Sequence, residues 1–310
     1  MRVAMYYNNN DIRIEDMDIP EINDDEMLVK VRYCGICGSD VMEWYRKKRA
    51  PCVLGHEISG VVSKVGDYVK KYRIGERVFV SHHVPCNTCV YCLRGDHTVC
   101  HTLHSTNFYP GGFSEYIRVP KINVDRGVFV LPEEVSDEEA VFIEPLGCVI
   151  RGQRIANLEP NRTVLVIGSG VTGILHIQYA KLTGASNIIA MDINRERLRK
   201  AEELGADATV HVKEKNIISQ ILQKNDGRLC DYVIVCTGAP SAIDTAFKTV
   251  DNAGTILFFA PTTPNNVITM PFNELWSKGV TITSTYAASP QDILEAIEVL
   301  KKRKIRVKEM

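Results

Sequence analysis

The stretch Thr163-Val-Leu-Val-Ile-Gly-Ser-Gly-Val-Thr-Gly173 decides the fold of the second half of the chain. An apolar, β-branched run precedes its first glycine, and a helix is expected after it, as far as Gly184. A second apolar run, Asn187-Ile-Ile-Ala-Met191, follows that helix. The order of strand, glycine-rich turn, helix and strand predicts a βαβ unit.

The same stretch has the pattern of a dinucleotide-binding turn. The first glycine turns the chain, the second lets the backbone approach a pyrophosphate, and the third permits close packing of helix on strand. The helix N-terminus directs the positive end of its dipole at the phosphates. Asp192 can accept hydrogen bonds from an adenosine ribose, and Arg197 can stack on the adenine. The cofactor-binding residues predicted from this pattern are Gly168, Gly170, Val171, Thr172, Gly173, Asp192 and Arg197.

The carboxylate of Asp192 also bears on the choice of cofactor. It would repel the 2′-phosphate of NADP, so the sequence favours NAD. Arg195 and Arg197 lie close after it and keep NADP as the alternative. A tight turn that binds nothing is the other interpretation of the glycines, and the well-spaced aspartate argues against it.

Helices and apolar strands continue to alternate through the second half. Strands are expected at Asp231–Cys236 and Gly254–Phe259, with a helix between them and another at Arg195–Leu204. Strands that are apolar throughout and alternate with helices indicate a doubly wound parallel sheet, covered on both faces. Residues 290–302 have helical spacing, and Ile305–Val307 is expected to begin a strand.

The first half, to about Ile150, consists of short β-rich segments separated by glycine and proline. Their close spacing and alternating polarity predict a small barrel or folded sheet. The expected strands are Met27–Tyr33, Ile58–Val62, Arg77–Val80 and Tyr116–Val119.

Composition excludes several classes of protein. The 310 residues are 45% hydrophobic, and 37 Lys and Arg against 38 Asp and Glu give a net charge of −1. That apolar content is too high for a disordered chain, and a nucleic-acid binder would carry a basic excess. There is no apolar run of about 18 residues and no leader-like N-terminus, so we expect a soluble, cytoplasmic protein of two domains that binds neither nucleic acid nor membrane.

Four of the ten cysteines form a compact set, C-x2-C-x2-C-x7-C, in a segment rich in turn residues. Four closely spaced thiolates match tetrahedral zinc at a structural site with no open position. An iron–sulfur cluster is the nearest competitor, but its usual run has a shorter last spacing and a proline after the final cysteine. Unliganded thiols are the remaining alternative. The predicted structural zinc ligands are Cys86, Cys89, Cys92 and Cys100.

A second candidate metal site combines Cys37 with His56. Catalytic zinc uses three protein ligands and leaves the fourth position for water or substrate, so a carboxylate should complete the set. Glu57 and Glu144 are the two candidates. Glu144 sits among apolar neighbours, where a carboxylate needs a metal or another cation as its partner, and a salt bridge at a domain junction is the alternative.

Several motifs occur together in an order that resembles the zinc-containing medium-chain dehydrogenase/reductase family, in its branch of sorbitol, galactitol and threonine dehydrogenases. The resemblance covers essentially the whole chain. The motifs are Gly35-Ile-Cys-Gly-Ser-Asp40, Gly55-His-Glu57, the four-cysteine set, Gly111-Gly-Phe-Ser-Glu-Tyr116, Phe142-Ile-Glu-Pro-Leu146 and Val164-Leu-Val-Ile-Gly-Ser-Gly170.

The resemblance implies a GroES-like catalytic domain at residues 1–150 that holds both zinc ions, and a Rossmann NAD-binding domain at 151–285. Residues 286–310 would begin the return to the catalytic domain. The implied enzyme transfers hydride between NAD and a secondary alcohol or polyol, with the alcohol bound to zinc, and forms a homo-oligomer, a dimer or a tetramer.

The resemblance also assigns roles to individual residues. Cys37, His56 and Glu144 would hold catalytic zinc, with Glu57 as an exchanging ligand or a neighbour of the ligands. Ser39 would pass on the proton of the alcohol. Thr237 and Gly238 would lie beside the adenosine, and Phe259, Ala260 and Pro261 beside the nicotinamide.

Two departures from the family pattern stand out. Met42 occupies the position where many relatives have a histidine that finishes the proton relay, and the chain ends at Met310, earlier than the family usually does. A truncated chain, or a catalytically silent member that keeps the fold and the structural zinc, is therefore the alternative. Glu43 and Trp44 are candidate substrate contacts, whereas His82 and His83 are expected to be surface or structural residues.

Overall fold

The computed structural model describes residues 1–213 and 216–310. The chain divides into two compact units. Unit 1 contains Met1–Gly147 and Ala287–Lys302, and unit 2 contains Cys148–Tyr286 and Arg303–Met310. The boundary between Gly147 of unit 1 and Cys148 of unit 2 falls within one helix, α6 (Ile143–Ile155).

Unit 2 is built on a parallel six-stranded sheet in the order β11-β10-β9-β12-β13-β14. The strands at its centre are mainly apolar, and Val164, Leu165 and Val233 are fully buried. This is the pattern of a sheet covered on both faces. The strands are β9 (Thr163–Ile167), β10 (Asn187–Asp192), β11 (Ala208–His211), β12 (Cys230–Val235), β13 (Val250–Phe258) and β14 (Thr281–Ser284).

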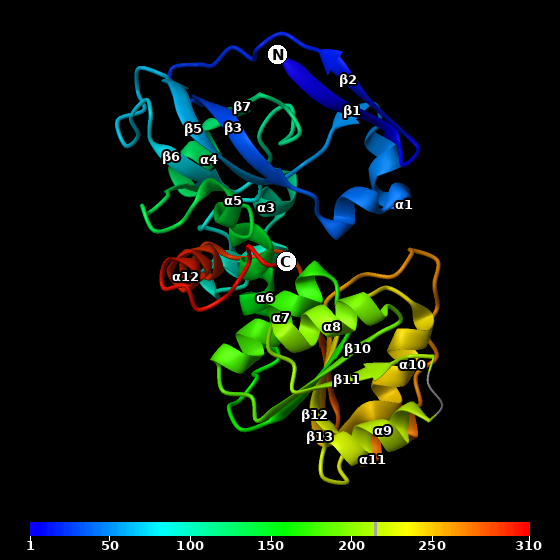
Figure 1. The fold of residues 1–310 in the computed structure, drawn as a ribbon. Coiled ribbons are helices and arrows are strands. Elements are labelled where there is room, and N and C mark those ends of the chain that lie inside the picture. The colour runs from blue at the N-terminus through cyan, green and yellow to red at the C-terminus, as the bar shows by residue number, and fades with distance from the viewer. Residues whose placement is uncertain (214–215) are drawn as a thin grey trace. The chain divides into compact units, whose positions relative to one another are not determined.

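The helices of unit 2 cover the two faces of this sheet (Figure 1). Ile177 of α7 and Leu198 of α8 pack in the apolar core on one face, and Ile221 of α9 and Phe247 of α10 pack in the core on the other. The predicted doubly wound sheet is therefore confirmed. The helices are α7 (Val171–Leu182), α8 (Arg195–Glu203), α9 (Ile217–Lys224), α10 (Pro240–Thr249) and α11 (Phe272–Ser277).

Unit 1 is rich in antiparallel strands, which form a five-stranded sheet, β7-β3-β5-β6-β8, and a three-stranded sheet, β2-β1-β4. Met27, Val29 and Ile58 are fully buried in its core. The strands are β1 (Arg2–Asn8), β2 (Asp11–Asp16), β3 (Met27–Gly35), β4 (Cys52–Val53), β5 (Glu57–Val65), β6 (Arg77–Val80), β7 (Tyr116–Val119) and β8 (Val128–Val130).

Short helices occupy the connections of unit 1. Among the described α-helices that lie wholly in unit 1, all but α12 are only four to six residues long. They are α1 (Glu43–Arg46), α2 (Val90–Leu93), α3 (His101–Ser105), α4 (Lys121–Arg126), α5 (Asp137–Ala140) and α12 (Pro290–Lys301).

One predicted strand is wrong. Ile305–Val307 forms no strand, although Ile305 and Val307 are buried. Instead, the backbone N–H of Arg306 donates to the side chain of Gln178 on α7, so this segment packs within unit 2 through side chains. The apolar pattern of Ile305–Val307 therefore reflects burial of its side chains and not pairing in a sheet.

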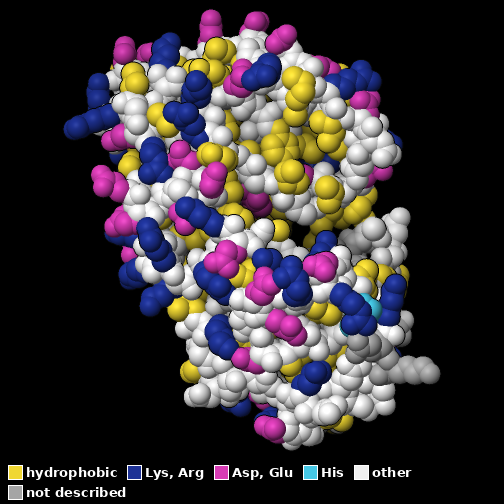
Figure 2. Space-filling model, viewed as in Figure 1, with side chains coloured by type: hydrophobic (Ala, Val, Ile, Leu, Met, Phe, Trp, Pro, Cys, Tyr) yellow, Lys and Arg dark blue, Asp and Glu magenta, His cyan; other side chains and the backbone are white. Residues whose placement is uncertain are grey.

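Lys and Arg are interspersed with Asp and Glu over the face seen in Figure 2, with no large patch of a single sign. This agrees with the net charge of −1. Within the described ranges, no helix is both long enough and apolar enough to cross a bilayer.

Candidate active site and metal centres

The four cysteines of the predicted structural site lie together in the connection between β6 and β7. Their sulfur atoms are all within 4.8 Å of one another. Helix α2 begins directly after Cys89, and this turn brings Cys92 back to within 3.5 Å of the Cys89 sulfur. The backbone N–H groups of Thr88 and Cys89 donate to the sulfur of Cys86 at 3.4 and 3.2 Å.

These surroundings suit a metal. The hydrogen bonds from the side chain and backbone of Thr88 and from the backbone of Cys89 lower the pKa of Cys86 to about 5, whereas burial raises that of Cys92 to about 12. The buried apolar core of the lobe consists of Cys92, Cys100 and Leu103. Because four packed thiols next to so small a core need a further crosslink to hold their geometry, the residues fit tetrahedral zinc.

A second group gathers where β3 ends and β5 begins. Cys37 caps the short turn that follows β3, and His56 and Glu57 stand at the start of β5. Their ligand atoms lie within 4.8 Å of one another. The N–H of Cys37 donates to the carboxylate of Asp40 at 3.0 Å, and the N–H of Ser39 donates to the Cys37 sulfur at 3.4 Å.

Glu144 reaches the same histidine from the first turn of α6. A ligand oxygen of Glu144 and ring nitrogens of His56 and His82 form another group within 4.8 Å. His82 is 9% exposed, and its ring centroid is 4.7 Å from that of His56. His82 was expected to be a surface or structural residue, and the surface part of that expectation is wrong. Its position two residues after β6 was the available signal, because β6 is antiparallel to β5 and the residues after β6 therefore lie beside those that begin β5.

The electrostatics of this group call for a cation. Burial and, after it, the nearby charge of Glu144 raise the pKa of Glu57 to about 8. Burial alone would lower the pKa of His56, but its hydrogen bonds to Asp40 and Cys37 hold that pKa well above its usual value. Two carboxylates and a thiol around one buried histidine match the donor set of zinc.

Ser39 has partners on two sides. Arg46, at the end of α1, donates from Nε to the Ser39 carbonyl at 2.9 Å and from Nη2 to the Ser39 hydroxyl at 2.6 Å. The same Nη2 is 3.4 Å from Oδ1 of Asp40, and that oxygen is 3.6 Å from Nδ1 of His56. Sequence reasoning missed Arg46, which stands within a run of basic residues that is typical of a solvated surface.

In unit 2 the glycine-rich turn has the backbone that the sequence predicts. Gly168 has φ +95°, which favours glycine, and Gly170 directly precedes α7. A Cβ on Gly173 would stand 1.9 Å from the carbonyl oxygen of Gly168, so this position admits no side chain. A Cβ on Gly170 would meet nothing within 4 Å. The turn is therefore closed on its packed side and open in front of the helix N-terminus.

Asp192 ends β10 beside this turn and is 5% exposed. One carboxylate oxygen accepts from the N–H of Ser169 at 2.7 Å, and the other accepts from the N–H of Asn194 at 2.8 Å. Arg197 lies 3.9 Å from this carboxylate. Because each oxygen has a second lone pair, Asp192 can fix the turn and still accept from a ligand.

The other predicted cofactor residues follow β12 and β13 at the same edge of the sheet. A Cβ on Gly238 would stand 2.3 Å from the carbonyl oxygen of Pro261, so the two loops touch. The N–H groups of Phe259 and Ala260 both donate to the carbonyl of Val235, at 3.0 and 3.2 Å. Thr237 lies directly after β12. The structure thus brings these residues together with the glycine-rich turn.

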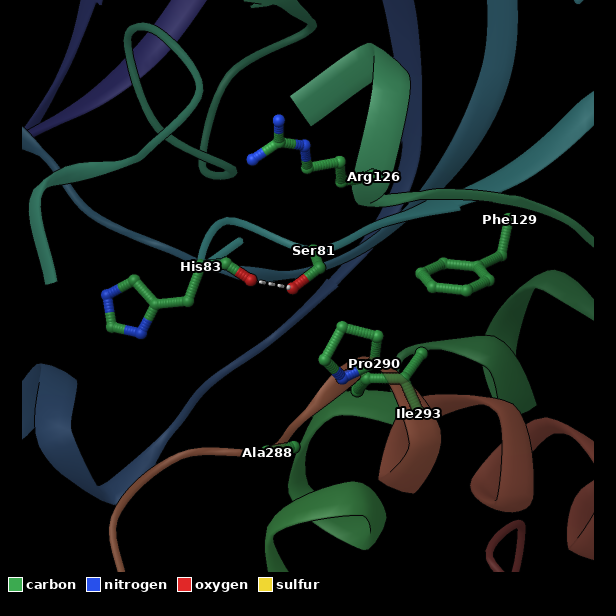
Figure 3. Close-up of a pocket in the computed structure, with 7 residues that line it drawn as sticks. All are labelled: Ser81, His83, Arg126, Phe129, Ala288, Pro290 and Ile293. Atoms are coloured by element: carbon green, nitrogen blue, oxygen red, sulfur yellow. Dashed lines mark hydrogen bonds between the residues drawn. The ribbon is translucent and has the colours of Figure 1, made fainter. Parts of the chain in front are cut away.

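A small pocket of unit 1 lies apart from both metal groups (Figure 3). The Ser81 hydroxyl donates to the carbonyl of His83 at 2.9 Å along one wall. Arg126 extends from α4 and donates from Nη1 to the carbonyls of Pro85 and Cys86 at 3.0 and 2.7 Å, which ties α4 to the four-cysteine lobe. The lining residues are Ser81, His83, Arg126, Phe129, Ala288, Pro290 and Ile293.

Comparison with known proteins agrees with this arrangement. The model of the alcohol dehydrogenase GroES-like domain matches residues 23–129, and that of the zinc-binding dehydrogenase domain matches residues 171–302. Sorbitol dehydrogenase from Bacillus subtilis is 31% identical over 293 residues, which are 90% of this chain and 82% of the relative. L-threonine 3-dehydrogenase from the same organism is 34% identical over 278 residues, or 87% and 78%.

A solved structure is also similar over the whole chain. It is the short chain alcohol dehydrogenase from Escherichia coli CFT073 complexed with NADH, with a TM-score of 0.87 and 29% identity, and the match covers 100% of this chain and 90% of that one. Two domain models thus match most of the chain, and relatives above 30% identity cover most of it. The chain belongs to the zinc-binding alcohol dehydrogenase family, whose members are oxidoreductases that act on CH–OH groups.

Proposed function

We propose that this chain is a zinc-dependent dehydrogenase that transfers hydride between NAD and a secondary alcohol or polyol, of the kind that sorbitol and threonine dehydrogenases act on. The observation that carries the proposal is the convergence of Cys37, His56 and Glu57 within 4.8 Å, with a ligand oxygen of Glu144 within the same distance of His56. Zinc bound there would act as a Lewis acid on the alcohol oxygen.

The chain's own residues would supply the rest. Cys37, His56 and one of the two carboxylates would hold the metal, and Asp40 would orient His56 through its Nδ1. Glu57 fits the third ligand position when Cys37 is engaged, since these two share one group with His56. Glu144 is the alternative third ligand, since its oxygen forms a second group with His56 and His82. The hydroxyl of Ser39 would accept the alcohol proton and release its own proton to water, while the carbon-bound hydrogen leaves with its electron pair to NAD.

Four thiolates, Cys86, Cys89, Cys92 and Cys100, would hold a second, structural zinc. We further propose a homo-oligomer and a cytoplasmic location, the latter supported by ten described cysteines of which none forms a disulfide. Sedimentation analysis of the purified protein and fractionation of expressing cells would test these two points.

Substitution of Cys37 tests the catalytic assignment. We expect Cys37→Ser to bind one zinc ion per chain instead of two and to lose at least about 1,000-fold in kcat/KM, because serine is a poor zinc ligand. Zinc is measured by atomic absorption and activity by the absorbance of NADH, across polyols, hydroxy amino acids and simple secondary alcohols.

The matched control is Cys52→Ser, since Cys52 lies in β4 and joins none of the metal-ligating groups of the described residues. It should keep both zinc ions and full activity. Wild-type protein with two zinc ions and bound NAD that oxidised no alcohol of the panel would contradict the proposal, as would full activity of Cys37→Ser.

Two glycine substitutions test the cofactor assignment. Gly170→Ala should leave the unfolding temperature unchanged, because its Cβ meets nothing within 4 Å, but should raise KM for NAD at least about 10-fold by occupying the path of the pyrophosphate. Gly173→Ala should instead destabilise unit 2, because its Cβ would overlap the Gly168 carbonyl. Equal NAD affinity in Gly170→Ala and wild type would reject the site.

A further inference from the structure

Arg46 is a cation in the candidate active site that the proposed chemistry does not use. Its side chain is 12% exposed, so it is held inside the site instead of reaching into solvent. It clasps Ser39 from two nitrogens, at 2.9 Å to the carbonyl and 2.6 Å to the hydroxyl. The ring of Tyr45 lies 4.7 Å below the guanidinium carbon. These contacts fix the plane and direction of the guanidinium beside the hydroxyl expected to take the alcohol proton.

The third nitrogen of this guanidinium is still available. Nε and Nη2 are engaged by Ser39, whereas Nη1 makes no hydrogen bond to any described residue, and it does not count among the buried unpaired nitrogens. It is therefore open to a ligand. Because a guanidinium presents its N–H groups in a rigid fork, the free donors of Nη1 face a fixed direction next to the reacting hydroxyl.

The two acids nearest to Arg46 in the sequence are shared with other partners. Asp40 is 3.4 Å from Nη2, but its other oxygen accepts from the Cys37 N–H, and the carboxylate is shared with His56. Glu43 pairs at 3.8 Å with Lys47. The three residues that follow Arg46 are Lys47, Lys48 and Arg49, all exposed, and Arg49 lies over the same tyrosine ring at 5.9 Å.

We propose that Arg46 binds an anionic oxygen group of the substrate, so that the preferred alcohol carries a carboxylate or a phosphate ester near the carbon that is oxidised. The proposal rests on the proposed function, since it concerns the same site. A partly desolvated guanidinium with unused donors is costly beside a neutral polyol, whereas an anionic group pairs with it in charge-assisted hydrogen bonds.

The wild-type holoenzyme gives the first test, with pairs of alcohols that differ in charge. Sorbitol is compared with sorbitol 6-phosphate, and 1,3-butanediol with 3-hydroxybutyrate, as substrates for NAD reduction. We expect kcat/KM for the anionic member of at least one pair to exceed that of its neutral partner by about 10-fold or more. The two pairs distinguish a phosphate from a carboxylate as the recognised group.

Substitution of Arg46 then assigns the preference to this side chain. Arg46→Met should lower kcat/KM for the anionic substrate by about 10- to 100-fold more than for its neutral partner, and this excess loss should lie mainly in KM. A loss that both substrates share would come through the hydrogen bonds of Arg46 to Ser39. Arg46→Lys, which keeps the charge and loses the fork, should fall between. Lys48→Met removes an exposed cation of the same run and should change neither substrate.

A binding measurement provides a readout that does not depend on turnover. The dissociation constants of isobutyrate and its neutral isostere isobutyramide for the NADH complex are measured by calorimetry. Arg46→Met should weaken isobutyrate binding and leave that of isobutyramide unchanged. Retention of both zinc ions and of the unfolding temperature checks that the variant is folded.

Each result decides between distinct possibilities. A wild-type enzyme that oxidises neutral alcohols better than both anionic partners overturns the anionic substrate and leaves the proposed function standing. An equal loss for charged and neutral substrates in Arg46→Met would mean that Arg46 acts only through Ser39. No oxidation of any alcohol would reject the proposed function itself.

Discussion

The four-cysteine lobe and the group around His56 differ in how the chain assembles them. The lobe takes four ligands of one type from residues 86–100, a single connection between two strands. The other group takes a thiol, two imidazoles and two carboxylates from segments that end β3, begin β5, follow β6 and begin α6. In the lobe the ligands are neighbours in sequence, whereas around His56 they are neighbours only because the sheet has formed.

This difference means that the structure of the lobe should depend on its metal, whereas metal binding around His56 should depend on the fold. The lobe buries little apolar surface, so its order should come from the metal. The group around His56 rests on a sheet that has an extensive apolar core of its own, in which Met27, Val29 and Ile58 are fully buried. There the fold positions the ligands, and loss of the metal should cost activity with little change in structure.

Removal of a lobe ligand should therefore have the largest effect on stability. Cys92→Ser should lose one zinc ion and reduce the free energy of unfolding of unit 1 by more than about 4 kcal/mol, because a buried hydroxyl replaces a metal bond. Thermal unfolding and limited proteolysis would measure this, with cleavage expected within residues 86–100. Under the same conditions Cys37→Ser should lose one zinc ion and keep its unfolding temperature within a few degrees. Equal destabilisation by both substitutions would contradict the comparison.

The second prediction concerns His82, which lies beside His56 and Glu144 in the group around His56. His82→Asn should reduce kcat/KM and the affinity for the catalytic zinc by about 10- to 100-fold, the range found for residues that support metal ligands. Its stability should change less than that of Cys92→Ser. Competition with a chelator measures the zinc affinity.

The neighbouring imidazole supplies the control. The rings of His82 and His83 are 3.8 Å apart, but His83 lines the small pocket of Figure 3 and joins none of the metal-ligating groups of the described ranges. His83→Asn should therefore keep zinc affinity and activity close to wild type. A stronger effect of His83→Asn than of His82→Asn would show that the wrong histidine has been assigned.

The same contrast explains what the sequence predicts and what it misses. Features set by local spacing are recovered well: β6 and β7 coincide with the expected strands, and α8 differs from its prediction by one residue. The four cysteines and the glycine-rich turn are likewise local patterns, and in the structure each forms one site. Spacing is sufficient where the ligands share one turn.

What depends on strand pairing is missed. Nothing near His82 in the sequence refers to Glu144, and the two meet only because the end of β6 and the start of α6 lie close together in unit 1. Arg46 belongs to a basic run that is typical of a solvated surface, but at the end of α1 its side chain is directed at Ser39 and donates to the Ser39 hydroxyl. Ile305 is buried without a strand because side chains on α7 hold its neighbour. For His82 and Ile305, the deciding contact joins segments that lie far apart in the sequence. For Arg46, it depends on the direction in which the side chain points, which the sequence pattern does not reveal.

The third prediction is the smallest and concerns the attachment of the lobe. Arg126 donates two hydrogen bonds to the carbonyls of Pro85 and Cys86, so it holds the first cysteine against α4. Arg126→Met should reduce the free energy of unfolding by about 1 to 3 kcal/mol and speed the release of the structural zinc to a chelator several-fold. Lys121→Met, at the exposed start of the same helix, should do neither. If the metal alone ordered the lobe, Arg126→Met would release zinc at the wild-type rate. Faster release would mean that protein contacts also hold the lobe. The lobe would then differ less from the group around His56, whose ligands are positioned by the fold.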